Sequence, residues 1–411
     1  MSALDNPQRE SHRVLTVNSG SSSLKIALFR VGNDVVKTMS GAVTGIGASE
    51  ARMSAETAYG DTLWDERTCC INHPVALETF FHEMAAHVDL GGISAVGHRV
   101  VHGGPHYTSA QRLTPKVEAD LRKLIPLAPL HMPANLDGIV AARLRLPNAL
   151  HYACFDTSFH SDMPIAAQRT GLPPEMEDPF IRRFGFHGLS YAFIVDDLAA
   201  RAGKAVSRQR LLVAHLGAGA SMAAIENRQT IDTSMGFSAL AGLPMATRSG
   251  DVDPGLLLHL IIEKGWAPSV LRDQLYLGAG LLGLSGLSGD VKTLLKSQDP
   301  NASEALAQFA YQARKQAGAL IAAMGGVDRI IFTGGVGEHA PSIRAAICQP
   351  LSDLYRIKFD AAANDRGEAC ISKPDSGVIV ETVHTDEAMM IARHGREMFE
   401  AAPAQMKRRA S

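Results

Sequence analysis

Short apolar segments alternate along this chain with longer segments in which apolar residues recur at helical spacing. The run VLTV at residues 14–17 and the run IIFT at residues 330–333 are typical of buried strands. In the segment at residues 302–324 apolar positions recur every three or four residues, which predicts one long helix. Strands that alternate with helices in this way predict an α/β protein.

Three helix starts are signalled by capping residues. Thr114 and Asp253 each precede a proline, so a side-chain acceptor stands at the cap and proline at the first helical position. Thr385 is predicted to cap the last helix, with Asp386 and Glu387 in the first turn, where negative charge is favourable.

One strand–turn–strand pattern occurs twice. VLTVNSGSSSLKIALF, which begins at Val14, and LLVAHLGAGASMAAIE, which begins at Leu211, each run from an apolar strand through small residues into a second apolar strand. Aligned, Asn18 falls on His215 and Gly20 falls on Gly217. A repeated unit predicts two similar domains flanking a central cleft, although two unrelated hairpins would give the same weak match.

Three turns are rich in small residues. The first, at residues 18–25, holds more hydroxyl, amide and ammonium groups than a turn requires, which is typical of an anion site. The second contains Gly217. In the third, a strand that ends at Thr333 enters the glycine-rich turn 334–337 before a helix, which suits a nucleotide because glycines let phosphates approach the backbone. The sequence has no P-loop and no dinucleotide-binding pattern.

Charged residues accompany several of these segments. Arg99 lies inside an apolar strand, as a structural ion pair or as an anion-binding group. Asp156, after a strand, and His187, between glycines, also have ordinary explanations as a turn residue and a surface residue. Arg248 lies in a small-residue loop, and Glu387 could simply complement a helix dipole. Taken together, these residue types suit phosphoryl transfer from a nucleotide to a small anion.

Length and charge narrow the class of protein. The chain has 411 residues, which predicts two or three domains, and its net charge of −2 argues against a nucleic-acid partner. We expect no membrane partner, because no apolar run is long enough to span a bilayer and the polar N-terminal segment lacks the apolar core of a secretory signal. Five cysteines without a C-x-x-C pair fit reduced thiols in a cytoplasmic enzyme.

The motifs NSGSSSLK, GHRVVHGG, FDTSFH, RRFGFHG, TRSGDVDP and FTGGVGE, in this order between residues 14 and 393, resemble those of the acetate kinase family, which includes propionate kinases. The resemblance implies duplicated actin/Hsp70-like (ribonuclease H-like) domains of the actin/Hsp70/sugar-kinase superfamily. It implies a homodimer that transfers a phosphoryl group reversibly from ATP to acetate by direct in-line attack, giving acetyl phosphate and ADP, with Mg²⁺ or alternatively Mn²⁺. We expect an acyl- and phosphoryl-site domain at residues 1–156 with 385–411, and a nucleotide-binding domain at residues 157–384.

By position, the resemblance also implies residue roles. Arg99 and Arg248 would bind the carboxylate and the moving phosphoryl group, Asp156 would act near the metal, and His187 would stabilise the transition state. The implied metal ligands are Asn18 and Glu387, and the implied phosphoryl site comprises Asn18, Ser21, Ser23 and Lys25. The implied acyl pocket comprises Arg99, Val101, Leu130, Phe186 and Ala239, with His131 nearby. The implied ATP site comprises Lys25, His215, Leu216, Gly217, Ala218, Gly219, Asp290, Val291, Lys292, Gly335, Val336, Gly337 and Glu338.

Several positions depart from the family pattern. Ala218 and Ala220 replace an asparagine and a serine of the second turn, so ATP binding is expected to be weaker. Lys292 replaces an arginine near the adenosine, which leaves the choice between ATP and GTP open. Tyr191 stands where the family usually has histidine. Ala239 replaces a proline and leaves room for a further methylene, so a propionate kinase or a broader short-chain acyl kinase is an alternative.

Two other functions fit the same fold. A catalytically inactive ATP-binding scaffold agrees with the changes in the second turn, but a scaffold has no need of Arg99, Arg248 and His187. A sugar or polyol kinase is the other, and paired arginines suit an anionic acceptor better than a neutral one.

Overall fold

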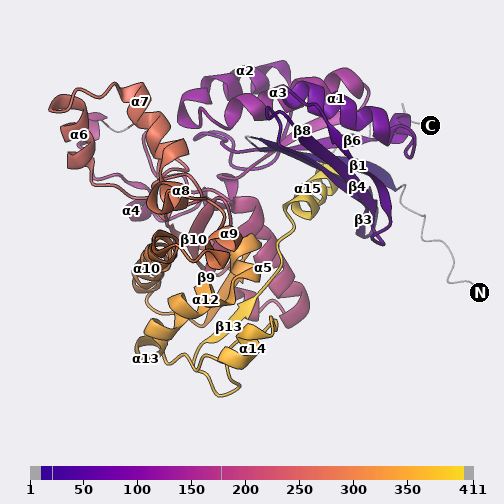
Figure 1. The fold of residues 1–411 in the computed structure, drawn as a ribbon. Helices are drawn as coiled ribbons and strands as arrows, with labels where there is room; N and C mark the ends of the chain where they lie inside the picture. The colour runs from indigo at the N-terminus through magenta and orange to yellow at the C-terminus, as the bar shows by residue number, and fades with distance from the viewer. Residues whose placement is uncertain (1–10, 21, 177, 402–411) are drawn as a thin grey trace, which may run out of the picture. The chain divides into compact units, whose positions relative to one another are not determined.

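The computed structural model describes residues 11–20, 22–176 and 178–401, and the chain divides into two compact units. The first unit comprises residues 1–158 and 386–411, and the second comprises residues 159–385. Each unit is built on one β-sheet with helices packed against it (Figure 1).

The first unit contains twelve named strands and α-helices within its described residues. These elements are β1 (His12–Ser19), β2 (Ser23–Val31), β3 (Val35–Thr44), β4 (Ala51–Thr57), β5 (Thr62–Thr68), α1 (His73–Met84), β6 (Ala95–Val100), β7 (Gln111–Arg112), α2 (Pro115–Lys123), α3 (Met132–Arg145), β8 (Leu150–Phe155) and α15 (Glu387–Ala401). The sheet order is β5-β4-β3-β2-β1-β6-β8-β7.

The second unit is richer in helix. Its elements are α4 (Ile165–Gln168), α5 (Gly188–Ala202), β9 (Leu211–Leu216), β10 (Ala220–Glu226), β11 (Gln229–Thr233), α6 (Pro254–Ile262), α7 (Pro268–Asp273), α8 (Gly280–Ser285), α9 (Val291–Lys296), α10 (Pro300–Met324), β12 (Arg329–Thr333), α11 (Gly334–His339), α12 (Pro341–Cys348), α13 (Ser352–Tyr355), α14 (Ala361–Asp365) and β13 (Ile379–Thr382). The sheet order is β11-β10-β9-β12-β13.

The two sheets share one topology. In the first sheet, β3, β2 and β1 pair antiparallel, and β1, β6 and β8 pair parallel. In the second sheet, β11, β10 and β9 pair antiparallel, and β9, β12 and β13 pair parallel. The sequence repeat therefore reflects a duplicated α/β unit, and the predicted fold class is confirmed.

Helices cover both faces of the first sheet. Leu15 and Val17 of β1 belong to the core that α1 fills with Leu77 and Phe80. Residues of the opposite parity in β1 point to the other face. There, a Cβ on Gly395 of α15 would lie 3.4 Å from a methyl carbon of Val14.

Gly97 of β6 allows α15 to lie close to the sheet. A Cβ at this position would lie 2.4 Å from a methyl carbon of Ile391 and 2.5 Å from the Tyr152 hydroxyl, so any side chain would push the helix away. The Tyr152 hydroxyl donates to the Ile391 carbonyl at 2.8 Å. These contacts seat the first turn of α15, which carries Glu387, beside the end of β6.

In the second unit, α5 packs against the sheet through its apolar face. Tyr191, Ile194 and Leu198 of α5 share a buried core with Leu211 and Val213 of β9. On the same sheet, α10 contacts β9, β10 and β11. The first turn of α5 is therefore held next to β9 and β10, the strands of the repeated hairpin.

The predicted helix starts are partly right. Thr114 caps α2 and Asp253 caps α6, each followed by proline, as predicted. The prediction that Thr385 caps the last helix is wrong. The Asp386 carboxylate accepts the Met389 N–H at 2.8 Å and α15 begins at Glu387, because Asp386 is the acceptor one residue before the helix.

The predicted glycine turn at residues 334–337 is also wrong in detail. Helix α11 begins at Gly334 itself, directly after β12. The Glu338 carboxylate accepts the Gly334 N–H at 3.0 Å, which supplies the partner that a helix start lacks.

Among the described residues, no helix combines the length and apolar character needed to cross a membrane.

Candidate active site

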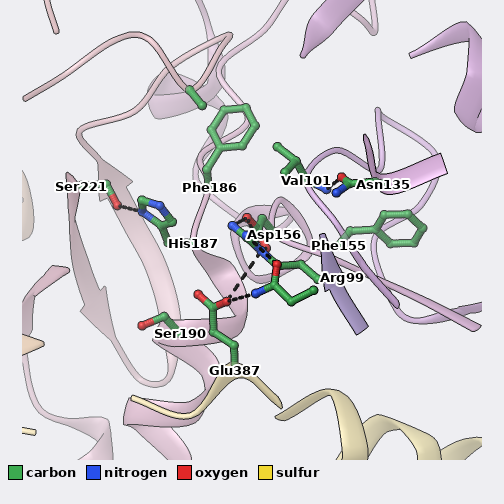
Figure 2. Close-up of polar contacts among 12 residues, drawn as sticks. Arg99, Val101, Asn135, Phe155, Asp156, Phe186, His187, Ser190, Ser221 and Glu387 are labelled. Atoms are coloured by element: carbon green, nitrogen blue, oxygen red, sulfur yellow. Dashed lines mark hydrogen bonds and ion pairs between the residues drawn. The ribbon is translucent and has the colours of Figure 1, made fainter. Parts of the chain in front are cut away.

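Arg99 and Asp156 form a two-point ion pair in the first unit. Arg99 lies on β6 and Asp156 directly follows β8, its parallel neighbour, so both strands end at the same edge of the sheet. Arg99 Nε donates to Asp156 Oδ1 at 2.9 Å, and Nη2 donates to Oδ2 at 2.5 Å (Figure 2). Asp156 is 1% exposed, so its charge depends on this partner.

Asn18 and Glu387 complete this cluster. Arg99 Nη1 donates to Asn18 Oδ1 at 3.1 Å, and Asn18 Nδ2 donates to Glu387 Oε2 at 3.2 Å. Glu387 Oε2 also lies 3.7 Å from Arg99 Nε. Burial lowers the pKa of Arg99, but the carboxylates of Asp156 and Glu387 more than offset this, so its pKa lies above the ordinary value. The guanidinium is therefore a fixed positive charge between two carboxylates.

The cluster has the donor chemistry of a magnesium site. Mg²⁺ binds one or two carboxylates, keeps several waters and takes its remaining ligands from phosphates. Asp156 and Glu387 supply two carboxylates within one hydrogen-bonded network, and Asn18 supplies an amide oxygen. No group of three or more His, Cys, Asp or Glu in the described part of the chain is arranged for a metal, and magnesium does not need one. The residues fit this ion.

Asn135 is a buried residue of this region that the sequence did not single out. Its side-chain oxygen accepts the Val101 N–H at 2.9 Å (Figure 2). Its Nδ2 donates to the Ser19 carbonyl at 2.7 Å. It thereby ties the end of β6 to the β1–β2 turn. In the sequence it is only the last residue of the segment LHMPAN, and in the structure it lies in the first turn of α3.

His187 is the centre of a second group, in the second unit. It is the N-cap residue of α5 in a left-handed conformation, φ 59°, which is uncommon for a residue other than glycine. Its Nδ1 lies 2.8 Å from Ser221 Oγ, as Figure 2 shows. Its ring stacks on His215 with centroids 4.3 Å apart. His187 is 8% exposed, so the alternative explanation of an ordinary surface histidine does not hold.

Arg248 reaches the same place. Its Nη1 donates to the Ala239 carbonyl at 2.6 Å. A Cβ on Gly219 would lie 2.8 Å from Arg248 Nη2 and 3.3 Å from His187 Nε2, so only glycine leaves room for both side chains. The guanidinium and the imidazole therefore lie together over the backbone of the turn between β9 and β10.

The two glycine-rich segments of the second unit, the β9–β10 turn and the start of α11, lie against each other. A Cβ on Gly334 would lie 2.7 Å from the Leu216 carbonyl oxygen, so α11 starts in close contact with the end of β9. The buried Arg344 donates Nη1 to the carbonyls of Gly337 and Glu338, at 2.9 and 2.8 Å, and so fixes the end of α11.

The remaining predicted residues are found in varied surroundings. Val101, Phe186 and Ala239 are buried, whereas Leu130 and His131 are half-buried. The Asp290 carboxylate caps α9, accepting the Thr293 N–H at 3.0 Å. Other predicted residues are exposed, namely Lys25, Ala218, Lys292 and Gly335. Buried or half-buried are Ser23, Leu216, Gly217, Val291, Val336 and Gly337. Ser21 lies outside the described residues.

The predicted residues thus form two groups, one in each unit. Asn18, Arg99, Asp156 and Glu387 meet in the first unit, and His187, His215, Arg248 and Gly219 meet in the second. The first group combines a cation with potential metal ligands. The second combines nitrogen donors with glycine-rich backbone. Such groups serve phosphoryl transfer, in which positioning and electrostatic stabilisation do most of the work.

Comparison with known proteins gives a consistent result. Residues 13–393 match the Acetokinase family. The chain is 43% identical to an acetate kinase of Rhodopseudomonas palustris (strain TIE-1) over 93% of this chain and 97% of that protein. The crystal structure of Porphyromonas gingivalis acetate kinase superposes with a TM-score of 0.83 at 36% identity, covering 94% of this chain and all of that one.

A propionate kinase has a similar fold. The crystal structure of that enzyme from Francisella tularensis subsp. tularensis SCHU S4 superposes with a TM-score of 0.85 at 29% identity, covering 93% of this chain and 98% of that one. With a family match over nearly its whole length, this chain belongs to the acetokinase family and is an enzyme of the kinase class.

Proposed function

We propose that this protein is an acetate kinase that transfers the γ-phosphoryl group of ATP reversibly to acetate. One acetate oxygen attacks the γ-phosphorus in line, the bond from that phosphorus to the β–γ bridging oxygen breaks, and the products are acetyl phosphate and ADP. No proton needs to move. The observation that best supports this is Arg99, a half-buried cation held between Asp156 and Glu387 in a chain of the acetokinase family.

The first group of residues would bind acetate and the metal. Arg99 offers a guanidinium whose planar donors match a carboxylate. Its position is fixed by Asp156 and Asn18, so little side-chain entropy is lost when acetate binds. Asp156, Glu387 and Asn18 would hold Mg²⁺, or Mn²⁺, directly or through water. The bound ion would supply positive charge to the phosphate oxygens.

The second group would stabilise the moving phosphoryl group. Arg248 and His187 present nitrogen donors over Gly219, and donors fixed in this way need no rearrangement as negative charge develops. The glycine-rich segments at residues 217–219 and 335–337 would bind the ATP phosphates through backbone N–H groups. Ser23, Lys25 and Ser21 would add donors to the phosphoryl group, and Asp290 and Lys292 would lie near the adenosine.

Trapping of the product with hydroxylamine tests the proposal. Acetate, ATP and Mg²⁺ should give acetyl hydroxamate with the purified protein, and R248A should lower the rate by 10²- to 10⁵-fold, which is typical of removing a catalytic cation. R272A provides the control, because Arg272 is an exposed arginine that pairs with its neighbour Asp273. No hydroxamate from the wild-type protein would refute the proposal and favour the inactive scaffold.

Propionate is proposed as a second substrate. Ala239 is 7% exposed and smaller than the proline that the family usually carries, and the Francisella enzyme of the same fold is a propionate kinase. One methylene changes affinity by about 1–3 kcal/mol in such pockets. We therefore expect kcat/KM for propionate within about 200-fold of that for acetate, measured across C1 to C4 carboxylates. In A239P, discrimination against propionate should increase, and an unchanged ratio would argue against this pocket.

The enzyme is also proposed to act as a homodimer in the cytoplasm. Several apolar side chains on or near α6 and α7 are exposed: Leu256 is 50%, Leu258 57%, Ile262 69%, Trp266 41% and Val270 51% exposed. Exposed apolar patches often mark protein interfaces. All five cysteines are free, which fits a reducing compartment.

Light scattering coupled to size exclusion tests the homodimer. The wild-type protein should elute at twice the monomer mass and L258E/I262E at the monomer mass. L144E changes a residue that is 80% exposed in the first unit, and it should leave the mass unchanged. A monomeric wild-type protein would refute the dimer.

A further inference from the structure

A chain of three hydrogen-bonding side chains ends at His187. The Tyr191 hydroxyl lies 2.5 Å from Ser221 Oγ, and Ser221 Oγ lies 2.8 Å from His187 Nδ1. Tyr191 and Ser221 are both 0% exposed. Tyr191 lies four residues after His187, in the first turn of α5, and Ser221 lies on β10. All three residues belong to the second unit.

The hydrogen atoms shared by Tyr191, Ser221 and His187 can be arranged in only one way that leaves no donor without an acceptor. Among the described residues, the Tyr191 hydroxyl has one hydrogen-bond partner, Ser221. Burial raises the pKa of Tyr191, although the bond to Ser221 lowers it, so the phenol keeps its proton at neutral pH. The phenol must then donate to Ser221 Oγ, because it has no other acceptor. Ser221 has one hydrogen, which goes to His187 Nδ1.

The opposite direction is unfavourable. If His187 Nδ1 carried a hydrogen and donated it to Ser221, Ser221 would donate to Tyr191, and the phenol hydrogen would be buried without an acceptor. A buried donor that lacks a partner loses its hydration without replacement. The geometry therefore favours an imidazole whose Nδ1 accepts and whose Nε2 carries the hydrogen.

We propose that Tyr191 and Ser221 are positioning residues that hold His187 in the Nε2–H tautomer, so that Nε2 donates to the transferred phosphoryl group. The role of Nε2 rests on the proposed function, whereas the tautomer itself does not. Nε2 is the ring nitrogen that lies beside Arg248 over Gly219. The two donors then act on one side of the turn, and the tautomer decides whether His187 is a donor there at all.

A neighbouring imidazole is held in a similar way, which makes a specific control available. His215, stacked on His187, has its Nδ1 2.9 Å from Ser190 Oγ, and Ser190 Oγ donates to Thr385 Oγ1 at 2.9 Å. Ser190 is therefore the hydrogen-bond partner of His215, as Ser221 is of His187. S190A should therefore alter the signals of His215 and leave the tautomer of His187 unchanged.

Nitrogen NMR of the full-length protein reads the tautomer directly. In long-range ¹H–¹⁵N spectra, the signals that disappear in H187Q belong to His187. We expect a protonated Nε2 and an unprotonated Nδ1 in the ligand-free wild-type enzyme at pH 7.5, and a mixture of tautomers in S221A. A protonated Nδ1 with an unprotonated Nε2 in the wild-type protein would overturn the proposal. This reading requires no variant of the chain to be active.

Kinetics supply the second test. S221A should lower kcat about tenfold and Y191F about threefold, as expected for the loss of one neutral hydrogen bond, with KM for acetate and ATP within about twofold. The controls are S207A, a buried serine that donates to the Lys204 carbonyl, and Y107F, whose hydroxyl donates to Asp120. If S221A and Y191F match these controls, the positioning role is wrong. If the wild-type protein makes no acetyl phosphate but shows the expected tautomer, the proposed function fails and the hydrogen-bond chain stands.

Discussion

The guanidinium of Arg99 donates two hydrogen bonds to the carboxylate of Asp156, from Nε to Oδ1 at 2.9 Å and from Nη2 to Oδ2 at 2.5 Å, where two parallel strands end side by side. The Asp156 carboxylate has two roles: it fixes the guanidinium of Arg99, and it belongs with Glu387 and Asn18 to the cluster that fits magnesium. Loss of the carboxylate should therefore affect stability and catalysis together.

D156N is expected to lower kcat at least 10²-fold and to lower the free energy of unfolding by about 3 kcal/mol, because it removes the buried carboxylate that pairs with Arg99 at two points. The hydroxamate assay and urea unfolding measure the two effects. D120N is the matched control: Asp120 pairs with Lys123 at the surface, where such pairs contribute about 0–1 kcal/mol. Equal unfolding midpoints for D156N and D120N would contradict this account.

R248K separates charge from geometry in the second group. Lysine keeps the positive charge but cannot both donate to the Ala239 carbonyl and present a second nitrogen over Gly219, as Arg248 does. We expect kcat to fall about 10²- to 10³-fold while the thermal unfolding midpoint stays within about 2 °C. A fall in rate of less than threefold would mean that only the charge of Arg248 matters.

Asn135 offers a test of the turn that carries the phosphoryl-site residues. In N135D the side chain still accepts the Val101 N–H but can no longer donate to the Ser19 carbonyl, whereas N135L loses both bonds. Each unsatisfied buried group costs about 1–3 kcal/mol, so urea unfolding should rank the wild-type protein as most stable. If the turn positions substrates, N135D should also raise KM for ATP. Unchanged stability in N135L would show that neither bond matters.

The parts of the fold and site that follow from local chemistry could be predicted from the sequence. The duplicated sheet was visible because both hairpins repeat the same apolar and glycine pattern. Arg99 and Asp156 meet because both belong to neighbouring parallel strands, and proline marked the true starts of α2 and α6. Each of these features depends either on residues close together in the sequence or on the order of the strands in the sheet.

The parts that failed depend on contacts distant in sequence. Thr385 and Asp386 are equally good capping residues, and only the folded chain shows that Thr385 accepts a hydrogen bond from Ser190 while Asp386 caps α15. The glycines of α11 predict a turn by propensity, but packing against β9 and the Glu338 carboxylate make them helical. Asn135 joins two backbone groups that no pattern relates.

His160 makes stability depend on pH. Burial lowers the pKa of this histidine from 6.5 to about 4, although its hydrogen bond to the Phe186 carbonyl raises it. The folded state therefore binds fewer protons than the unfolded state between these values, and stability falls as pH falls. His160 alone should remove about 2 kcal/mol of the free energy of unfolding between pH 7 and pH 5. Urea unfolding at the two pH values measures this loss.

H160Q provides the decisive comparison. Glutamine can donate to the Phe186 carbonyl and accept from Thr230, the two bonds that His160 makes, without titrating. Burial also lowers the pKa of His98. The wild-type protein should therefore lose more free energy of unfolding between pH 7 and pH 5 than His160 alone accounts for. The loss between pH 7 and pH 5 should be about 2 kcal/mol smaller in H160Q than in the wild-type protein or in H259Q, an exposed histidine of α6. Identical losses in all three proteins would show that His160 does not titrate as its burial requires.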